Sequence, residues 1–197
     1  EEEFTQETLA EETKSDFQDA KIIIVAGPSG AGKTLFIERL LEEYPDEFIF
    51  PVLTTTRNPR QGEVSDEYRR FVDEQTFLRQ RAWGELLMTR KSHGFWYGVE
   101  KSWLIEYLDT GRVLIFDTAS VRGINLIKGA FPKAAVVVIL PLSRDELNRL
   151  PQEEIKRFFR EIIRTRDKIT EEELHRRITD NLNNLYRFEQ AADKVII

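Results

Sequence analysis

The sequence KIIIVAGPSGAGKT, residues 21–34, decides the fold of this chain. The five residues after Lys21 are an apolar, mostly β-branched run, which is typical of a strand buried on both faces of a parallel sheet. The next eight residues, 27–34, match the pattern G-x-x-x-x-G-K-[ST]. Apolar residues then recur at helical spacing from Ile37 to Tyr44. The stretch therefore predicts a phosphate loop between a buried strand and a helix.

The chemistry expected of this loop follows from its residue types. Glycines allow consecutive backbone N–H groups to turn toward phosphate oxygens, and the helix N-terminus adds partial positive charge. Lys33 has the length to reach the β- and γ-phosphates of a nucleotide, and the Thr34 hydroxyl is a ligand for Mg²⁺. The predicted ATP-binding residues are Ser29, Gly30, Ala31, Gly32, Lys33 and Thr34. The alternative interpretation is a glycine turn that binds no ligand.

A phosphate loop also needs a carboxylate on the magnesium side, at the end of a neighbouring core strand. The run RVLIFD, residues 112–117, predicts such a strand and ends in Asp117. The predicted metal ligands are therefore Thr34 and Asp117, with Mg²⁺ accompanying ATP. A helix cap after the strand is the alternative role for Asp117.

Strands and helices alternate along the rest of the chain. Further β-rich runs predict strands at residues 48–54, 112–117, 134–140 and 194–197. Apolar spacing and Pro151 predict helices at residues 33–44, 74–81, 100–108 and 151–165, and capping boxes predict helix starts after Ser143 and Thr170. Alternation of this kind produces right-handed crossovers around a parallel sheet. We expect one α/β domain at residues 21–197, with a parallel sheet core flanked by helices.

The charge is distributed unevenly. The 197 residues are 41% hydrophobic and 32% charged, which indicates a folded globular protein, and the net charge is −6. Residues 1–20 hold eight acidic residues and one basic residue, and we expect this acidic leader to be flexible. Residues 21–197 carry 28 basic and 27 acidic residues. This balance argues against a protein that coats nucleic acid.

Cysteine is absent, which excludes disulfides and thiolate zinc sites. No apolar run approaches the roughly 18 residues of a membrane-spanning helix. The sequence therefore predicts a soluble, cytoplasmic protein with neither a nucleic acid nor a membrane as partner, and its phosphate loop predicts small-molecule substrates.

A second cationic stretch lies after the phosphate loop. The sequence TTTRNPRQGE, residues 54–63, places Arg57 and Arg60 three positions apart around a stiffening Pro59. Two guanidinium groups held in this way can chelate a phosphate with forked hydrogen bonds, and Tyr68 and the stretch FWYG, residues 95–98, can add phenolic donors. A solvated arginine pair fits the composition equally well.

The motifs GPSGAGKT, TTTRNPRQGE and FWYG, followed by a strand ending in Asp117, resemble the guanylate kinases in consistent order over residues 21–197. The resemblance implies a P-loop kinase fold that transfers the γ-phosphoryl group of Mg·ATP to GMP or dGMP. It also implies a small mixed acceptor-binding region, at about residues 53–110, and a helical lid, at about residues 150–168.

The resemblance assigns roles to individual residues. Arg57, Arg60, Tyr68 and Tyr97 match the residues that hold the acceptor's phosphate. Lys33, Thr34 and Asp117 match the ATP·Mg²⁺ side. Arg164, Arg166 and Arg177 fall where the family's lid and following helix supply arginines to the transferring phosphoryl group, and with Lys33 they are the predicted catalytic residues.

The departures from the family pattern concentrate at the guanine-binding positions. Polar residues of the family are replaced at four positions by Leu53, Met88, Val99 and Ala119, unless a short alignment slip brings Glu85 in place of Met88. An apolar pocket leaves the polar edge of guanine unpaired, at a cost of about 1–3 kcal/mol for each group. Nearby Arg90, Lys91 and His93 suit an acceptor with further negative groups, or form a solvated strand face.

Three functions remain open from the sequence. The first is a guanylate-kinase-like enzyme, with GMP or another phosphorylated compound as acceptor. The second is a scaffold module that binds phosphopeptides through the former acceptor site, although an intact phosphate loop has no purpose in a pure scaffold. The third is a sugar-phosphate kinase similar to the ribose bisphosphate kinases.

Overall fold

The computed structural model describes residues 21–59, 69–92, 94–108, 110–166 and 169–197. The predicted acidic leader, Arg60, Tyr68 and His93 lie outside the described residues. In the part of the chain that is described, every helix is too short or too polar to span a bilayer.

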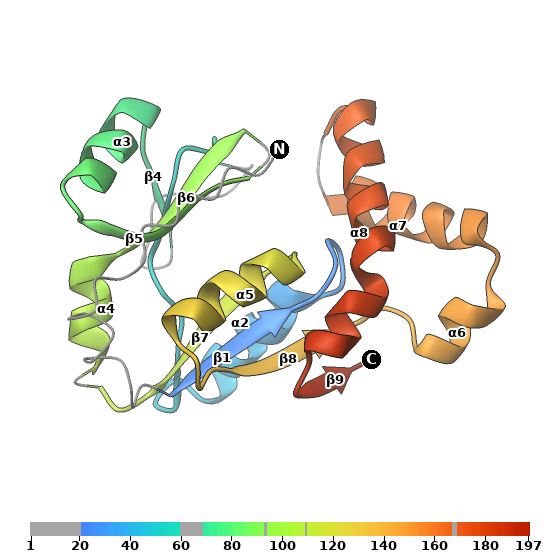
Figure 1. Ribbon diagram of the computed structural model, residues 1–197, viewed down its shortest axis with the longest axis horizontal. Coiled ribbons are helices and arrows are strands. Elements are labelled where there is room, and N and C mark those ends of the chain that lie inside the picture. The colour runs from blue at the N-terminus through green and yellow to red at the C-terminus, as the bar shows by residue number, and fades with distance from the viewer. Residues whose placement is uncertain (1–20, 60–68, 93, 109, 167–168) are drawn as a thin grey trace. The chain divides into compact units, whose positions relative to one another are not determined.

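A five-stranded sheet forms the centre of the fold (Figure 1). Its strands are β1 (Ile22–Ala26), β2 (Phe48–Ile49), β7 (Val113–Thr118), β8 (Ala135–Ile139) and β9 (Lys194–Ile196). They lie in the order β2-β7-β1-β8-β9, and the pairs β2–β7, β1–β8 and β8–β9 are parallel. The interior strands are built from β-branched and aromatic runs whose side chains are largely buried. The predicted parallel sheet core is confirmed.

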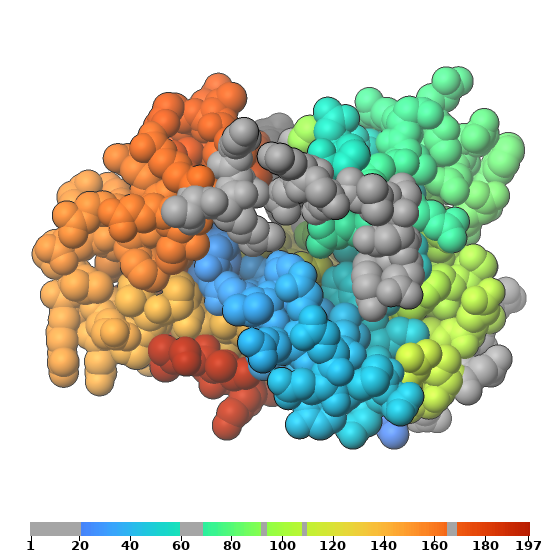
Figure 2. Space-filling model, turned by 180° about the vertical axis from the view of Figure 1, so that it is seen from behind, coloured from blue at the N-terminus to red at the C-terminus, as the bar shows by residue number. Residues whose placement is uncertain are grey.

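Helices flank this sheet, as predicted. The helices of this part of the chain are α2 (Lys33–Glu43), α5 (Val121–Ala130), α6 (Arg144–Arg149), α7 (Gln152–Arg166) and α8 (Glu171–Ala191), of which α7 packs on α8. Helix α5 lies in front of the sheet in Figure 1, whereas the view from behind in Figure 2 shows α2 (blue) at the surface. Ser143 and Glu146 form a complete capping box at the start of α6, and the Thr170 side chain accepts a hydrogen bond from the Glu173 N–H at the start of α8.

The other four strands of the described chain form a separate sheet, which shares no strand with the first. Its strands are β3 (Leu53–Thr55), β4 (Arg69–Phe71), β5 (Leu86–Ser92) and β6 (Phe95–Glu100), in the order β4-β3-β6-β5. The sheet is mixed, because β3 pairs with β4 in parallel and with β6 in antiparallel. Helix α3 (Glu74–Ala82) covers one face through Phe77, whose ring stacks on Trp96 at 5.8 Å. Helix α4 (Lys101–Leu108) follows β6.

One predicted element is wrong, and one helix was missed. Residues 48–54 do not form one strand, because β2 and β3 belong to different sheets. Pro51 lies between them, and a proline has no N–H for a sheet ladder. Helix α5 was not expected from the sequence, since Gly123 and Gly129 weaken its helical pattern, but the Ser120 hydroxyl caps it by accepting the Gly123 N–H at 3.0 Å.

The chain divides into two compact units. The first unit comprises residues 21–22, Tyr44–Phe116 and Leu126–Lys133 of the described chain, and its core includes the stacked rings of Phe116 and Phe131. The second comprises Ile23–Glu43, Asp117–Asn125 and Ala134–Ile197, and its core includes the packed helices α7 and α8.

The Tyr107 hydroxyl contacts backbone atoms of three residues of the first unit, Lys21, Arg112 and Leu114. The side chain is 4% exposed, and its hydroxyl lies 2.9 Å from the carbonyl oxygen of Lys21 and 2.7 Å from that of Arg112. It also accepts a hydrogen bond from the Leu114 N–H at 3.2 Å. Burial raises the pKa of the Tyr107 phenol above its ordinary value, because the phenolate loses its hydration.

We predict that Tyr107→Phe lowers the free energy of unfolding by about 1 kcal/mol, because it removes the hydrogen bonds of the hydroxyl, while the Leu114 N–H keeps its bond to the Lys21 carbonyl oxygen at 2.9 Å. The measurement is urea denaturation at pH 7. Tyr44→Phe is the matched control, since Tyr44 is 45% exposed and its loss is expected to cost about 0.5 kcal/mol or less.

We also predict that the stability difference between the wild type and Tyr107→Phe depends on pH. Because the folded-state pKa of Tyr107 is raised, the contribution of its hydroxyl is fully present below the unfolded value of about 10 and is lost as the pH rises through the folded-state pKa. The difference in stability between wild type and Tyr107→Phe is therefore expected to shrink above about pH 10. A difference that stays constant there contradicts the assignment.

Candidate phosphate-binding site

The predicted phosphate loop connects the end of β1 to the start of α2 in the second unit. Gly27 has a φ of 148°, and a Cβ atom placed on it would lie 2.1 Å from the carbonyl oxygen of Ile139 in β8. Neither the backbone conformation nor the space admits a side chain. The first glycine of the loop is therefore required by the close approach of β8.

Lys33 lies inside the loop that precedes it. The residue is 8% exposed, and its Nζ donates to the carbonyl oxygens of Gly27 at 2.7 Å and Pro28 at 2.9 Å. A buried ammonium group needs such partners because burial removes its hydration. The loop thus holds the cation where the sequence predicts phosphate binding.

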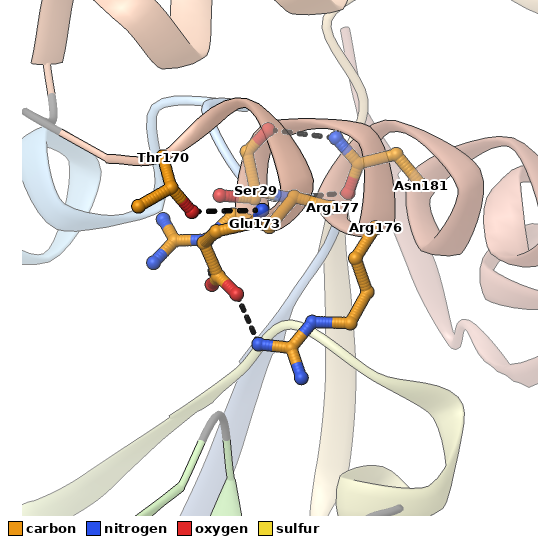
Figure 3. Close-up of polar contacts among 6 residues, drawn as sticks. All are labelled: Ser29, Thr170, Glu173, Arg176, Arg177 and Asn181. Carbon is orange, nitrogen blue, oxygen red and sulfur yellow. Dashed lines mark hydrogen bonds and ion pairs between the residues drawn. The ribbon is translucent and has the colours of Figure 1, made fainter.

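The tip of the loop contacts both long helices of the second unit. The Ser29 N–H donates to Asn181 Oδ1 at 2.9 Å, and Asn181 Nδ2 donates to the Ser29 carbonyl oxygen at 3.0 Å (Figure 3). A Cβ atom on Gly30, whose φ is 88°, would lie 2.4 Å from Ile162 Cγ2 of α7. Sequence reasoning missed Asn181, although a polar residue in the apolar stripe of a helix is a visible signal.

The two predicted metal ligands both belong to the second unit. Thr34 is half-buried in the first turn of α2, and Asp117 is half-buried near the end of β7. Their hydroxyl and carboxylate oxygens are the donors that Mg²⁺ prefers. The chemistry of this donor set therefore fits the ion.

The predicted catalytic arginines approach the start of α8. Arg164 of α7 pairs with Glu171, and Arg177 Nε donates to Glu173 Oε1 at 2.8 Å. Arg176 pairs with the other oxygen of Glu173 (Figure 3). Arg166 ends α7, but its side chain lies outside the described part. Two of the three arginines are thus held by carboxylates of the first turn of α8.

The predicted acceptor residues Arg57 and Tyr97 belong to the first unit. The guanidinium of Arg57 lies 5.3 Å from the centre of the Phe71 ring and donates to the Asn58 carbonyl oxygen at 2.8 Å. Tyr97 pairs with Thr55 in the sheet, and the guanidinium of Arg90 lies 5.6 Å from its ring centre. Their predicted companions Arg60 and Tyr68 lie outside the described residues.

Apolar residues continue the face of the small sheet that carries Tyr97. Val99 lies two positions after Tyr97 on β6, hence on the same face, and its register partners are Leu53 and Leu87. Met88 has a φ of 54° in the irregular segment between Leu87 and Arg90. Three residues that the sequence analysis placed near the base thus form or border one patch, the apolar face, defined as Leu53, Leu87 and Val99.

Other residues from the sequence analysis lie elsewhere. Ala119 is exposed in the second unit, and Glu85 is exposed before β5. Lys91 does not accompany Arg90, because its ammonium lies 5.2 Å from the Trp96 ring centre, beside Glu74. The expected cationic group of Arg90, Lys91 and His93 is therefore divided in the residues described, with Arg90 alone beside Tyr97.

Comparison with known proteins gives a family. The guanylate kinase family model matches residues 19–194. The chain is 39% identical over 126 residues to a guanylate kinase from Nitratidesulfovibrio vulgaris, which is 64% of this chain and 60% of that protein. It is 31% identical over 182 residues to a guanylate kinase from Trichormus variabilis, which is 92% of this chain and 82% of that protein. The match thus spans about three-fifths of the first relative's length.

A solved structure has the same fold. The crystal structure of guanylate kinase from Anaplasma phagocytophilum superposes with a TM-score of 0.60 at 23% identity. The superposition covers 91% of this chain and 77% of that chain. It supports the P-loop kinase fold over most of the sequence.

We predict that Gly30→Ala lowers the free energy of unfolding by about 1–3 kcal/mol more than Gly32→Ala, as measured by urea denaturation. Both glycines have positive φ, near 90°, but only the new methyl at Gly30 collides with Ile162, whereas nothing lies within 4 Å at Gly32. Adding Ile162→Ala to Gly30→Ala is expected to remove part of the excess. Equal losses at the two glycines contradict the contact between loop and α7.

Proposed function

We propose that this chain, which belongs to the guanylate kinase family, transfers the γ-phosphoryl group of ATP to the phosphate of a nucleoside monophosphate. The observation that carries this proposal is the phosphate loop between β1 and α2, with the ammonium of Lys33 buried inside it. Such a loop binds phosphates through backbone N–H groups and a helix N-terminus.

In the proposed reaction, an oxygen of the acceptor phosphate attacks the γ-phosphorus of ATP. The bond from the γ-phosphorus to the bridging oxygen breaks, and ADP leaves with the electrons of that bond. Because the acceptor supplies the nucleophile, the chain contributes position and charge. Lys33 opposes the negative charge of the phosphates, and Arg164, Arg166 and Arg177 stabilise the transferring group.

Thr34 and Asp117 are the residues that would hold Mg²⁺ on the protein side, since both offer oxygen donors in the second unit. When bound with ATP, the ion neutralises part of the phosphate charge. The proposed lid includes α7, which carries Arg164 and contacts the loop through Ile162. Closure of such a lid excludes water from the phosphates.

On the acceptor side, we propose that Arg57 and Tyr97 hold the phosphate, together with Arg60 and Tyr68. A planar guanidinium forms paired hydrogen bonds with phosphate oxygens, and a phenol adds one donor. The names of the relatives make GMP the first acceptor to test.

A second candidate is an acceptor other than a guanine nucleotide, and the apolar face favours it. Leu53, Leu87 and Val99 are register neighbours on the side of the sheet that carries Tyr97. Side chains without hydrogen-bonding groups cannot pair with the polar edge of guanine, so discrimination among bases is expected to fall far below the roughly 10⁴–10⁵ of a hydrogen-bonding site.

We predict that Lys33→Met lowers ATP-dependent phosphoryl transfer by about 100-fold or more, because it removes a positive charge at the phosphates while a side chain of similar length still fills the loop. The measurement is ADP release in a coupled assay, with circular dichroism as the control for folding. Lys194→Met is the matched variant, since Lys194 is exposed in the same unit and is expected to leave the rate unchanged. Equal rates for both variants argue against the proposed function.

We also predict that the double variant Leu53→Ser/Val99→Ser raises kcat/KM for GMP by about tenfold or more, because each hydroxyl can pair with the base edge. Leu78→Ser, at a leucine that is 40% exposed on α3, is the control. The assay compares GMP, dGMP, other nucleoside monophosphates and sugar phosphates. Efficient use of GMP by the wild type, with no gain in the double variant, overturns the second candidate.

The same assay, together with measurements of Mg·ATP and phosphopeptide binding, separates the remaining interpretations. Turnover of a sugar phosphate alone supports a ribose-bisphosphate-type kinase. Absence of Mg·ATP binding, together with capture of a phosphopeptide, supports the scaffold module.

A further inference from the structure

Helix α8 buries one polar side chain among apolar ones. Its buried residues are Leu174, Ile178, Asn181, Leu185 and Phe188. They recur every three or four positions and therefore form one stripe along the helix. Asn181 is the polar member of this stripe and is 4% exposed. Burial of an amide costs free energy unless its hydrogen bonds are made, so the partners of Asn181 indicate its role.

Those partners are both backbone atoms of one residue of the phosphate loop. The Asn181 amide accepts from the Ser29 N–H at 2.9 Å and donates to the Ser29 carbonyl oxygen at 3.0 Å (Figure 3). A carboxamide matches a residue's N–H and C=O in this way because it has one acceptor and one donor side by side. The contact, which we call the loop clamp, joins positions 152 residues apart in sequence.

Because of the loop clamp, one backbone N–H of the loop has a partner within the protein. The Ser29 N–H is engaged by Asn181, although the sequence analysis expected this residue among those that bind ATP. Of the N–H groups that follow, that of Ala31 donates to the Pro28 carbonyl oxygen at 3.2 Å, and those of the first turn of α2 lie at the helix N-terminus. Gly30 itself lies against Ile162 of α7. The segment before the phosphate-binding N–H groups is thus fixed by both helices.

The loop clamp also sets the register between the loop and an arginine. Arg177 lies one helical turn before Asn181, about 6 Å along the axis at 1.5 Å per residue, and on the same face. Its Nε donates to Glu173, one turn further back, at 2.8 Å. Whatever fixes Asn181 against the loop therefore fixes the starting position of Arg177 as well.

We propose that Asn181 is a positioning residue, which holds the phosphate loop in its nucleotide-binding conformation and keeps α8 in register with it. This inference rests on the proposed function, since it assigns nucleotide phosphates to the loop. A loop that is ordered before the nucleotide arrives loses less conformational freedom on binding, and its affinity is higher for that reason.

The first experiment uses the wild-type protein without nucleotide. Amide hydrogen exchange is followed by NMR at Ser29, with the exposed loop amide of Gly111 as the reference. The loop clamp predicts that the Ser29 amide exchanges at least about tenfold more slowly than its intrinsic rate, because its hydrogen is bonded within the protein. Exchange at Ser29 as fast as at Gly111 overturns the inference without requiring any variant.

The second experiment compares Asn181→Ala with Asn183→Ala, an exposed asparagine of the same helix. The dissociation constant for Mg·ATP is measured by calorimetry, so the result does not depend on the acceptor. We expect Asn181→Ala to bind Mg·ATP about tenfold or more weakly, which corresponds to about 1.4 kcal/mol, and Asn183→Ala to bind like the wild type.

The outcomes separate the inference from the proposed function. A purely structural role of Asn181 lowers the melting temperature and the active fraction but leaves the dissociation constant of the folded protein unchanged, and this result overturns the inference alone. A wild type that does not bind Mg·ATP overturns the proposed function, and the nucleotide role of Asn181 falls with it.

Discussion

The buried ammonium group of Lys33 is the constraint on which the second unit depends. A cation with 8% exposure is costly unless backbone oxygens replace its water, and here the carbonyl groups of Gly27 and Pro28 do so. For these carbonyls to face the lysine, the chain turns at Gly27 with a positive φ. The missing side chain at Gly27 in turn lets the Ile139 carbonyl of β8 approach. One buried charge thus links the sequence of the loop to the packing of the sheet.

The arginines of the candidate site that the structure describes have different partners in the two units. In the second unit, Arg164 and Arg177 are paired with Glu171 and Glu173, so each guanidinium has a carboxylate partner. In the first unit, Arg90 lies over the ring of Tyr97, and an aromatic ring orients a guanidinium without cancelling its formal charge. A phosphate that approaches Arg164 or Arg177 competes with a carboxylate. The proposed role of these two arginines therefore requires that a phosphate replace the carboxylate partner.

Local patterns in the sequence were sufficient for the sheet core and the loop, because a β-branched run, a glycine motif and a helical repeat each report on adjacent residues. The exchange of sheets at Pro51 was not predictable from the apolar run that spans it, since burial is similar in both sheets. The loop clamp depends on residues 152 positions apart, and no local pattern pairs Asn181 with Ser29. The polar residue within the stripe of α8 is a signal that sequence reasoning missed, and it does not by itself identify the partner.

Recognition of phosphate and recognition of a base respond differently to sequence change. The phosphate loop presents backbone N–H groups, so its chemistry survives substitution wherever the glycine conformations survive. On the small sheet, Leu53 and Leu87 are both register partners of Val99, so a hydroxyl introduced at Val99 is flanked by two apolar neighbours. A hydroxyl without a second polar group nearby costs more in lost hydration than one bond to a ligand returns. Polarity at these positions is therefore expected to change as a set, which accounts for apolar residues at all three.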